Sequence, residues 1–551
     1  MKALDMTHSL TRRSGPALMA VLFVFSAAAW GAPMGPDEAR LLISRAGFSA
    51  TEPEVRQFSA YSREEAVDRM LRASANATQA KTPPPAWSNE TVERPARLKT
   101  MSDAERREYQ QREARRQFEL KTWWMTEMLQ TPSPLAERMT LFWHNHFVSS
   151  AQKVRSPQLM YRQNVLLRKH ALGNFGELLH AVSKDPAMLI YLDAASNRKG
   201  APNENFAREV MELFTLGEGN YREADIKEAA RAYTGWSVDF DDNAAYRFRP
   251  GMHDDGVKTV LGRSGNFDGD AVLDILLAQP AAAEFIVKKM WREFVSPDVE
   301  LAANKNEIRR IAANFRNARY DIKVALRDIF TSPRFYAAEN RAVLIKSPVD
   351  LVVGTVRQFD IHYSDPLPFS FVTAGLGQNL FAPPNVRGWP GGDAWINSTT
   401  LLARKQFVER MFRVDEMRDL AGGMPRDAMN TSMESDMRDE KRADNGSQSQ
   451  FPPPVMAGSA TREAMRAKDF GQVKGAGRMG QEGRERFMRA ASTIQFDSSK
   501  YLAQFAGQPY GLVKRAVLPG EPAGTATDSL SAMNPQQLLR ALLLDPMYQL
   551  K

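Results

Sequence analysis

The sequence contains no cysteine among its 551 residues. This absence excludes disulfide bonds, thiolate catalysis, cysteine-bound zinc, iron–sulfur clusters and a lipid anchor on cysteine. If the protein is exported, its fold must rest on packing alone.

Several catalytic signatures are also missing. The chain has no G-x-S-x-G elbow, phosphate-binding Walker loop, dinucleotide-binding fingerprint or H-E-x-x-H helix. The net charge of +8 is mild for this length because acidic residues are interspersed with the basic ones. Basic residues do not alternate with aromatic ones in any groove-like stretch, so we expect no nucleic-acid binding.

Long apolar runs are almost absent, and the exception lies at the N-terminus, from Ala17 to Ala29. It follows Arg12 and Arg13 and ends at small residues around Gly31, a pattern typical of a signal peptide. The run is too short for a comfortable membrane span, and no second stretch is long and apolar enough to cross a bilayer. We therefore predict a signal peptide over residues 1–31 and no transmembrane segment in the mature chain. The protein is then expected to be periplasmic or secreted.

Helix signals dominate the remainder. Six pairs place a capping Ser or Asp before a proline, which suits the first turn of a helix. They are Ser133-Pro134, Asp185-Pro186, Ser296-Pro297, Ser332-Pro333, Ser347-Pro348 and Asp545-Pro546. Alternating strand patterns occur only at Ala245–Arg249 and Val257–Leu261. The sequence predicts a mainly α, multi-helix globular fold with one short β-hairpin near 245–261.

Composition divides the chain into segments. Residues 32–414 are predicted to form the main helical domain, which contains an irregular loop rich in Gly, Pro and Trp at 381–395. Residues 415–489 lack sustained periodicity and are rich in Met, Arg, Asp, Gly and Ser, which predicts a low-complexity, disordered insert. Residues 490–551 are expected to form a C-terminal helical segment that packs on the main domain.

The stretch from Asn203 to Gly217 is predicted to be one helix with two unlike faces. At 100° per residue, its apolar side carries Phe206, Val210 and Leu213. The other side carries Asn205, Glu209 and Glu212, with Arg208 at its edge. Carboxylates three residues apart are neighbours on a helix and can share a metal ion, although a solvated polar face explains them equally simply.

Histidines are rare, so their positions carry information. His144 and His146 end a helical run, where they would lie about 200° apart, so both could bind one metal only if the backbone opens. The alternative is that one of them packs in the core. His253 lies near the predicted hairpin, where it could ligate a metal, act as an acid or base, or stand in an ordinary turn.

These segments resemble the bacterial domain-of-unknown-function 1800 family of exported proteins over nearly the whole mature chain except the 415–489 insert. The matching motifs are LLISRAGFSA (41–50), LFWHNHF (141–147), NENFAREVMELFTLG (203–217), YREADIKEAARAYTGW (221–236), HDDGVKTVLG (253–262) and residues 383–404. The resemblance places signature residues at His144, His146, Asn203, Glu204, Asn205, Arg208, Glu209, Glu212, Trp236 and His253, with no catalytic role attached to any of them. Genes of this family commonly neighbour those of the exported domain-of-unknown-function 1501 family, which implies a partner by association.

Two functions fit these residues. The first is a metal-dependent hydrolase in which Glu209, Glu212, His144, His146 and His253 hold a divalent ion that activates water. Asn205, Arg208 and Trp236 would complete the polar site.

The second function is a non-catalytic helical scaffold or binding partner of another exported protein. Here Glu209 and Glu212 would pair with basic residues, and the loop from Trp389 to Trp395 would form a binding surface. The two are distinguished by geometry: the histidines either converge on the glutamates around a cleft or scatter into separate surroundings.

Overall fold

The computed structural model describes residues 31–422, 481–505, 510–524 and 527–551. The predicted signal peptide lies outside these residues except for Gly31, and so does most of the predicted 415–489 insert. Helices extend into both ends of that segment, because α20 (Ser398–Gly422) runs past its start and α23 (Gln481–Ser492) begins before its end.

The fold is mainly α, as predicted. The first half contains α1 (Gly35–Ala46), α2 (Glu52–Phe58), α3 (Arg63–Ala75), η1 (Ala86–Asn89), α4 (Pro95–Thr100), α5 (Asp103–Gln130), α6 (Pro134–His146), α7 (Ala151–Val154), α8 (Pro157–Lys169), α9 (Phe175–Ser183), α10 (Pro186–Tyr191), η2 (Ala194–Ser196), α11 (Glu204–Glu209), the π-helix η3 (Val210–Thr215) and α12 (Glu223–Ala232). After the strands come α13 (Gly269–Leu277), α14 (Pro280–Phe294), α15 (Ala302–Asn317), α16 (Ile322–Thr331), α17 (Pro333–Tyr336), η6 (Ala338–Asn340), α18 (Pro348–Gln358), α19 (Leu367–Gly375), η7 (Gly392–Trp395) and α20. The chain closes with α23, α24 (Ser498–Ala503), α25 (Tyr510–Val517), α26 (Thr527–Ser531), α27 (Pro535–Leu544) and η9 (Pro546–Gln549).

Most of the predicted proline-headed helices are present. Asp185 accepts a hydrogen bond from the Met188 amide at 3.0 Å, and Ser347 forms a full capping box with Asp350. The pairs at 133, 332 and 545 also head helices, although Ser133 makes no side-chain cap bond. The pair at 296 does not, because the next helix begins at Ala302.

The predicted hairpin is wrong in its pairing. Both predicted strands exist, but β2 (Ala245–Phe248) pairs with the preceding β1 (Trp236–Asp239), and β3 (Lys258–Val260) pairs with the following β4 (Arg263–Gly265). The reason is local for the second pair. Leu261 and Gly262 both have positive φ, at 48° and 78°, and such a two-residue turn directs the chain straight back onto β3. The short helices η4 (Phe240–Asp242) and η5 (Pro250–Met252) accompany these strands.

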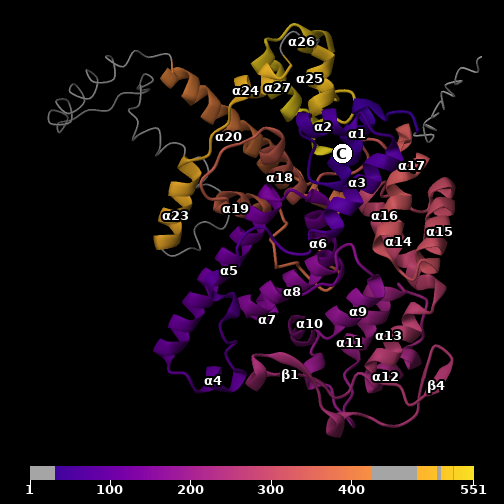
Figure 1. Ribbon diagram of the computed structural model, residues 1–551. Helices are drawn as coiled ribbons and strands as arrows, with labels where there is room; N and C mark the ends of the chain where they lie inside the picture. Colours follow the sequence, from indigo (N-terminus) through magenta and orange to yellow (C-terminus); the bar gives the residue numbers. More distant parts are fainter. Residues whose placement is uncertain (1–30, 423–480, 506–509, 525–526) are drawn as a thin grey trace, which may run out of the picture.

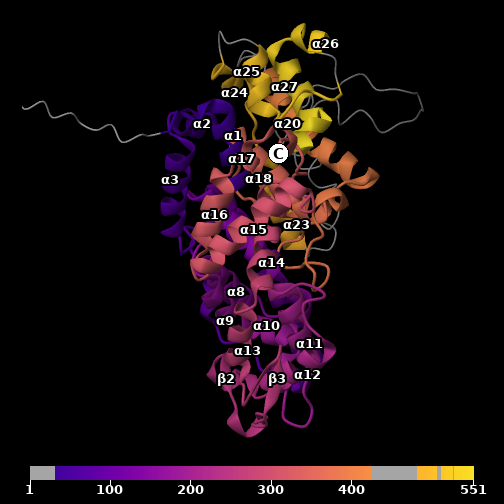
Figure 2. The same ribbon diagram turned by 90° about the vertical axis from the view of Figure 1, so that its right-hand side faces the viewer.

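The elements form an elongated molecule in two views (Figures 1 and 2). The β-strands lie at one end, and α24 to α27 lie at the other end beside α1 and α2. The buried Arg45 of α1 donates to the main-chain oxygens of Val295 at 3.0 Å and Lys551 at 3.1 Å. The end of the chain is therefore tied to its first helix.

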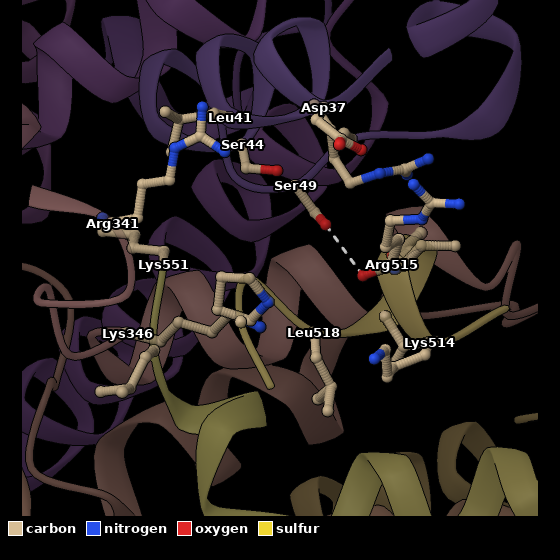
Figure 3. A pocket seen from close by; sticks show the side chains of 18 of the residues that line it. Asp37, Leu41, Ser44, Ser49, Arg341, Lys346, Lys514, Arg515, Leu518 and Lys551 are labelled. Atoms are coloured by element: carbon tan, nitrogen blue, oxygen red, sulfur yellow. Dashed lines mark hydrogen bonds between the residues drawn. The ribbon is translucent and has the colours of Figure 1, made fainter. Parts of the chain in front are cut away.

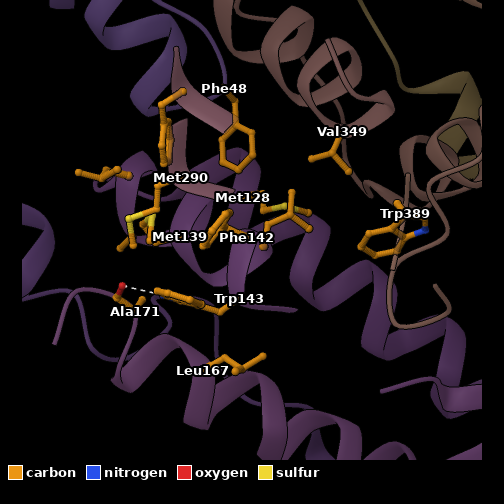
Figure 4. Close-up of a cluster of buried hydrophobic side chains, with 14 of the residues drawn as sticks. Phe48, Met128, Met139, Phe142, Trp143, Leu167, Ala171, Met290, Val349 and Trp389 are labelled. Carbon is orange, nitrogen blue, oxygen red and sulfur yellow. Dashed lines mark hydrogen bonds between the residues drawn. The ribbon is translucent and has the colours of Figure 1, made fainter. Parts of the chain in front are cut away.

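The core surrounds α6 on all sides. Met139, Phe142 and Trp143 are buried together, and the Trp143 indole donates to the Ala171 carbonyl at 2.9 Å (Figure 4). A helix buried all round belongs to the centre of a large fold. The two histidines at its end, His144 and His146, are accordingly both buried.

Among the described residues, no helix combines the length and the apolar character that crossing a membrane requires.

Candidate functional site

The signature segment begins as an α-helix and changes to a π-helix. α11 ends at Glu209 and η3 starts at Val210. The Leu216 amide donates to the Met211 carbonyl five residues earlier at 2.8 Å, and the Thr215 hydroxyl donates to the Val210 carbonyl at 2.7 Å. The prediction of one regular helix is therefore wrong from Val210 onward. Such π-segments are frequent at functional sites.

Asn203 and Asn205 hold the start of this segment. The Asn203 side chain accepts from the Asn205 amide at 2.9 Å and caps α11. The Asn205 side chain donates to the Leu192 carbonyl at 3.1 Å. The Asn203 side chain also donates to the Asp193 carbonyl at 3.1 Å, so both signature asparagines connect α11 to the turn after α10.

Arg208 connects α11 to α12. Its guanidinium donates to Glu223 at 3.0 Å and to Glu204, one turn earlier on its own helix, at 3.4 Å. These partners are more than a third exposed, so the ion pairs orient the helices and add little stability.

Glu212 is held by two partners. One carboxylate oxygen accepts from the Tyr221 hydroxyl at 2.6 Å, and the other accepts from Arg387 at 3.0 Å. Arg387 also pairs with Glu218 at 2.9 Å. It comes from the Gly/Pro/Trp loop, so this loop is joined to the signature helix.

Glu209 differs from its neighbours. It is half-buried, and no described residue donates a hydrogen bond to its carboxylate. Burial and the charge of Glu212 raise its pKa, while Arg387 and Arg208 act in the opposite direction. Glu209 is thus the one signature carboxylate among the described residues that accepts no hydrogen bond, and its pKa is raised.

His146 is buried with both ring nitrogens occupied. Nε2 lies 3.1 Å from the Phe214 carbonyl, and Nδ1 lies 3.0 Å from the Lys289 ammonium. Burial and the neighbouring Lys289 charge hold the pKa of His146 well below its ordinary value. Burial likewise lowers the pKa of Lys289 to about 7. The ring joins α6, η3 and α14.

His144 lies in an aromatic enclosure. Its ring is 5.3 Å from Trp124, 5.5 Å from Phe381 and 5.7 Å from Trp389, measured between centroids. Its Nε2 is buried without a hydrogen-bond partner among the described residues, and burial lowers its pKa to about 4. The prediction left open that one histidine of the pair packs in the core, and both do so.

Asn145, between the two histidines, anchors the loop. Its amide oxygen accepts from the Trp389 amide at 2.7 Å, and its amide nitrogen donates to the Trp389 carbonyl at 3.3 Å. Gly388 adopts φ of 82° against this side chain, where a Cβ would collide with the Asn145 oxygens. Trp389 and Trp395 are 4% and 7% exposed, so they anchor the loop inward.

His253 and Trp236 have contacts of their own at the strand end. His253 Nδ1 lies 2.9 Å from the Thr234 carbonyl, and its ring packs on Phe248. Trp236 is buried against Phe206, Tyr233 and Tyr246. Within the described ranges, no three His, Asp or Glu side chains form a group that could hold a metal ion. The metal site of His144, His146, Glu209, Glu212 and His253 stays a prediction without a matching cluster.

Four residues that hold the signature residues in place could not be recognised from the sequence pattern: Asn145, Lys289, Tyr221 and Arg387. Three of them lie inside motifs quoted above or next to them, but their partners are distant along the chain. The Gly/Pro/Trp composition of the 381–395 loop is the one sequence signal of an ordered segment near these residues.

A groove beside α5 could not be recognised from the sequence either. A cavity of about 720 Å³ separates α4 and α5 from α7 and α10 and is lined by Leu98, Tyr109, Leu159, Ile190 and Phe240 among others. A second hollow of about 440 Å³ shares Glu93, Tyr109, Glu113 and Ser156 with it. We call this continuous depression the α5 groove; the helices on its two sides are visible in Figure 1.

A protein-family model described as "Protein of unknown function (DUF1800)" matches residues 41–550. Searches of curated proteins and of solved structures found no significant match.

Proposed function

The chain belongs to the DUF1800 family of proteins of unknown function, and we propose that it is a non-catalytic helical binding protein. In this proposal it is exported and holds a polypeptide segment of another exported protein in the α5 groove. The partner implied by gene association is a protein of the domain-of-unknown-function 1501 family.

The observation that carries the proposal is that most signature side chains already contact other residues of the fold. His146 contacts Phe214 and Lys289, and Glu212 contacts Tyr221 and Arg387. Asn205, Arg208 and His253 also have hydrogen-bond partners within the fold, whereas the Glu209 carboxylate accepts no hydrogen bond from the described residues. Contacts of this kind hold the elements of the fold together and need no reaction to explain them. The geometry therefore favours a scaffold over a converging catalytic set.

The α5 groove supplies a surface of suitable size and chemistry. Its volume of about 720 Å³ lies within the range of binding clefts, which is about 300–1,000 Å³. Leu98, Ile190 and Phe240 are partly exposed along it, and charged residues such as Arg106 and Asp193 line the same depression. An apolar centre with a polar rim is the usual anatomy of a protein-binding surface.

Coexpression with the proposed partner tests this function. The full chain should form a complex that survives size-exclusion chromatography. Ala114→Trp places a large side chain on an exposed, groove-lining position of α5 and should weaken the complex at least ten-fold. Ala104→Trp makes the same change at an exposed position of α5 outside the groove lining and should leave it intact.

Equal binding by both variants would place the contact elsewhere on the molecule. Absence of any complex, together with turnover of a substrate by the purified protein, would overturn the proposal. Cell fractionation of the full chain tests the export part, which requires loss of residues 1–31 and recovery outside the cytoplasm.

Glu209 favours a second function, the predicted hydrolase, because a half-buried carboxyl group with a raised pKa is suited to acid–base chemistry. The metal-dependent form of this function has less support, because His144, His146 and His253 make separate contacts. If this function is correct, Glu209→Gln abolishes turnover, while Glu218→Gln, at an exposed neighbouring carboxylate, does not. Elemental analysis of the purified protein tests the metal directly.

A further inference from the structure

Another cavity lies between α1 and the C-terminal residues around the end of α25. Its volume is about 230 Å³. Leu41 and Ser44 of α1, Arg341 and Lys346 of the loop before α18, and Arg515 and Leu518 at the end of α25 line it (Figure 3). In the figure, Arg341 and Lys346 lie on one side of the cavity and Lys514 and Arg515 on the other.

The cavity wall is strongly basic. Six basic side chains line it, Arg40, Arg341, Lys346, Lys514, Arg515 and Lys551, against two acidic ones, Asp37 and Glu521. Three of the basic groups already have carboxylate partners: Arg40 pairs with Glu52 at 2.6 Å, Lys514 with Glu521 at 2.7 Å and Lys551 with Asp350 at 2.8 Å. Arg341, Lys346 and Arg515 have no carboxylate partner among the described residues.

Lys346 is the group in greatest need of a counter-charge. Its ammonium lies 3.8 Å from the centre of the Tyr548 ring, and no oxygen of the described residues accepts its hydrogen bonds. The side chain is half-buried between α18 and the C-terminal residues. Burial of a cation without a hydrogen-bonded anionic partner costs desolvation free energy. An anion bound from solution next to the Lys346 ammonium would offset that cost.

We propose that this cavity binds a small oxyanion, a carboxylate or phosphoryl group, through Lys346, Arg341 and Arg515. Planar guanidinium groups match the oxygens of such anions, and an ammonium adds a point charge. The volume is below that of drug-sized pockets, so the ligand is small. Leu41, Phe48 and Leu518 also line the cavity and could contact a short apolar portion of the ligand.

The same ligand would connect distant parts of the chain. The lining comes from α1, from the loop that precedes α18 and from the segment that follows α25. Bound anion would therefore bridge the first helix and the C-terminal segment. A ligand that binds only the folded state raises the melting temperature of the protein. Binding of the anion should therefore be detectable as a rise in Tm as well as by calorimetric titration.

Protonation of Lys346 supplies a further readout. Burial, opposed by Asp350 and reinforced by the charges of Lys551 and Arg404, lowers the pKa of Lys346 to about 7. The group is charged below that pH and neutral above it. Anion affinity should therefore fall between pH 6 and pH 8, and this fall should be much smaller in Lys346→Gln.

Calorimetric titration of the full chain tests the proposal, with inorganic phosphate in one arm and succinate in the other, at constant ionic strength set by potassium chloride. We expect saturable binding of at least one of them, a Kd raised at least ten-fold by Lys346→Gln, and partial recovery in Lys346→Arg. Lys500→Gln removes an exposed lysine outside the cavity and should change nothing.

Arg515→Gln provides a second variant at an exposed position, which decides the matter if Lys346→Gln does not fold. It should raise the Kd at least three-fold. The arm that binds identifies the class of anion. Absence of saturable binding in both arms, or binding unchanged by Lys346→Gln and Arg515→Gln, would overturn the proposal.

Discussion

Replacement of Asp350 by Asn should destabilise the fold strongly, because this carboxylate is the shared partner of two buried cations. Asp350 lies in the first turn of α18 and is 2% exposed. One oxygen pairs with Arg138 of α6, and the other accepts from Lys551 at 2.8 Å and from the Ser347 amide at 3.0 Å. Arg138 and Lys551 are themselves 1% and 7% exposed. One carboxylate thus joins the central helix, α18 and the last residue.

The magnitude follows from what the substitution leaves behind. Asn keeps the shape but removes the charge, so two buried cations lose their shared anion, although Arg138 keeps Glu293 at 2.6 Å. Breaking a buried pair in this way costs about 3–5 kcal/mol. An unfolding entropy of about 2.1 cal/mol/K per residue gives about 1 kcal/mol per degree for a chain of this size that unfolds as one unit. We therefore expect the Tm to fall by about 3–5 °C.

Differential scanning calorimetry at pH 7 measures this shift, with Asp360→Asn as the matched control. Asp360 pairs with Lys500 at 2.6 Å, but its side chain is 80% exposed, so its loss should change Tm by less than about 1 °C. Equal shifts for the two variants would refute the reasoning that burial makes Asp350 costly to remove.

The pH dependence of this variant has a defined sign. Burial acts to raise the pKa of Asp350, but Arg138 and Lys551 overcome that effect and hold the pKa below its ordinary value. Because the folded-state pKa is depressed, the stabilisation is complete above the unfolded-state pKa of about 4 and is lost as pH falls further. The difference between wild type and Asp350→Asn should be constant from pH 7 to pH 5 and shrink below pH 4.

Two further predictions concern the signature site. Gly388→Ala should lower the Tm more than Gly391→Ala, since both glycines have positive φ but only at Gly388 would a Cβ collide with Asn145; calorimetry compares them, and equal losses would mean that the contact with Asn145 does not matter. His144 should make the protein less stable as pH falls from about 6.5 towards 4, because its folded-state pKa is lowered to about 4 and the unfolded chain takes up the proton first. His144→Phe should flatten the Tm profile in that window by an amount equivalent to about 1–3 kcal/mol, and an unchanged slope would assign the acid sensitivity to other groups.

Local chemistry explains what the sequence predicted well. A Ser or Asp before proline stabilises a helix start through bonds within one turn, so Ser347 and Asp185 could be recognised without knowledge of the fold. Strand pairing depends on the turn that joins the strands. The positive φ of Leu261 and Gly262 decided the partner of β3, and neither an alternating pattern nor a strand length contains that information.

The histidine pair shows where periodicity stops being informative. The expected separation of His144 and His146 around α6 agrees with their different surroundings, since one contacts Trp389 and the other Lys289. Assigning residues to helix faces at 100° per residue is informative only when one side of the helix is exposed to water. Here α1, α3, α5 and α8 pack against α6, while α14 and the Gly/Pro/Trp loop contact the two rings. The burial of both rings follows from that long-range packing.

The same limit applies to the glutamate pair, and it explains why Glu209 and Glu212 have different surroundings. A regular helix would place them on one face, but the change to i→i+5 bonding after Glu209 widens the turn between them. Glu212 accepts a hydrogen bond from Arg387, which is 175 residues distant in sequence. Glu209 accepts no hydrogen bond from any described residue. The loop that supplies Arg387 is in turn fixed by Asn145 of the HNH motif. The HNH motif is therefore coupled to the carboxylates through the loop backbone, by a route that requires no shared metal ion.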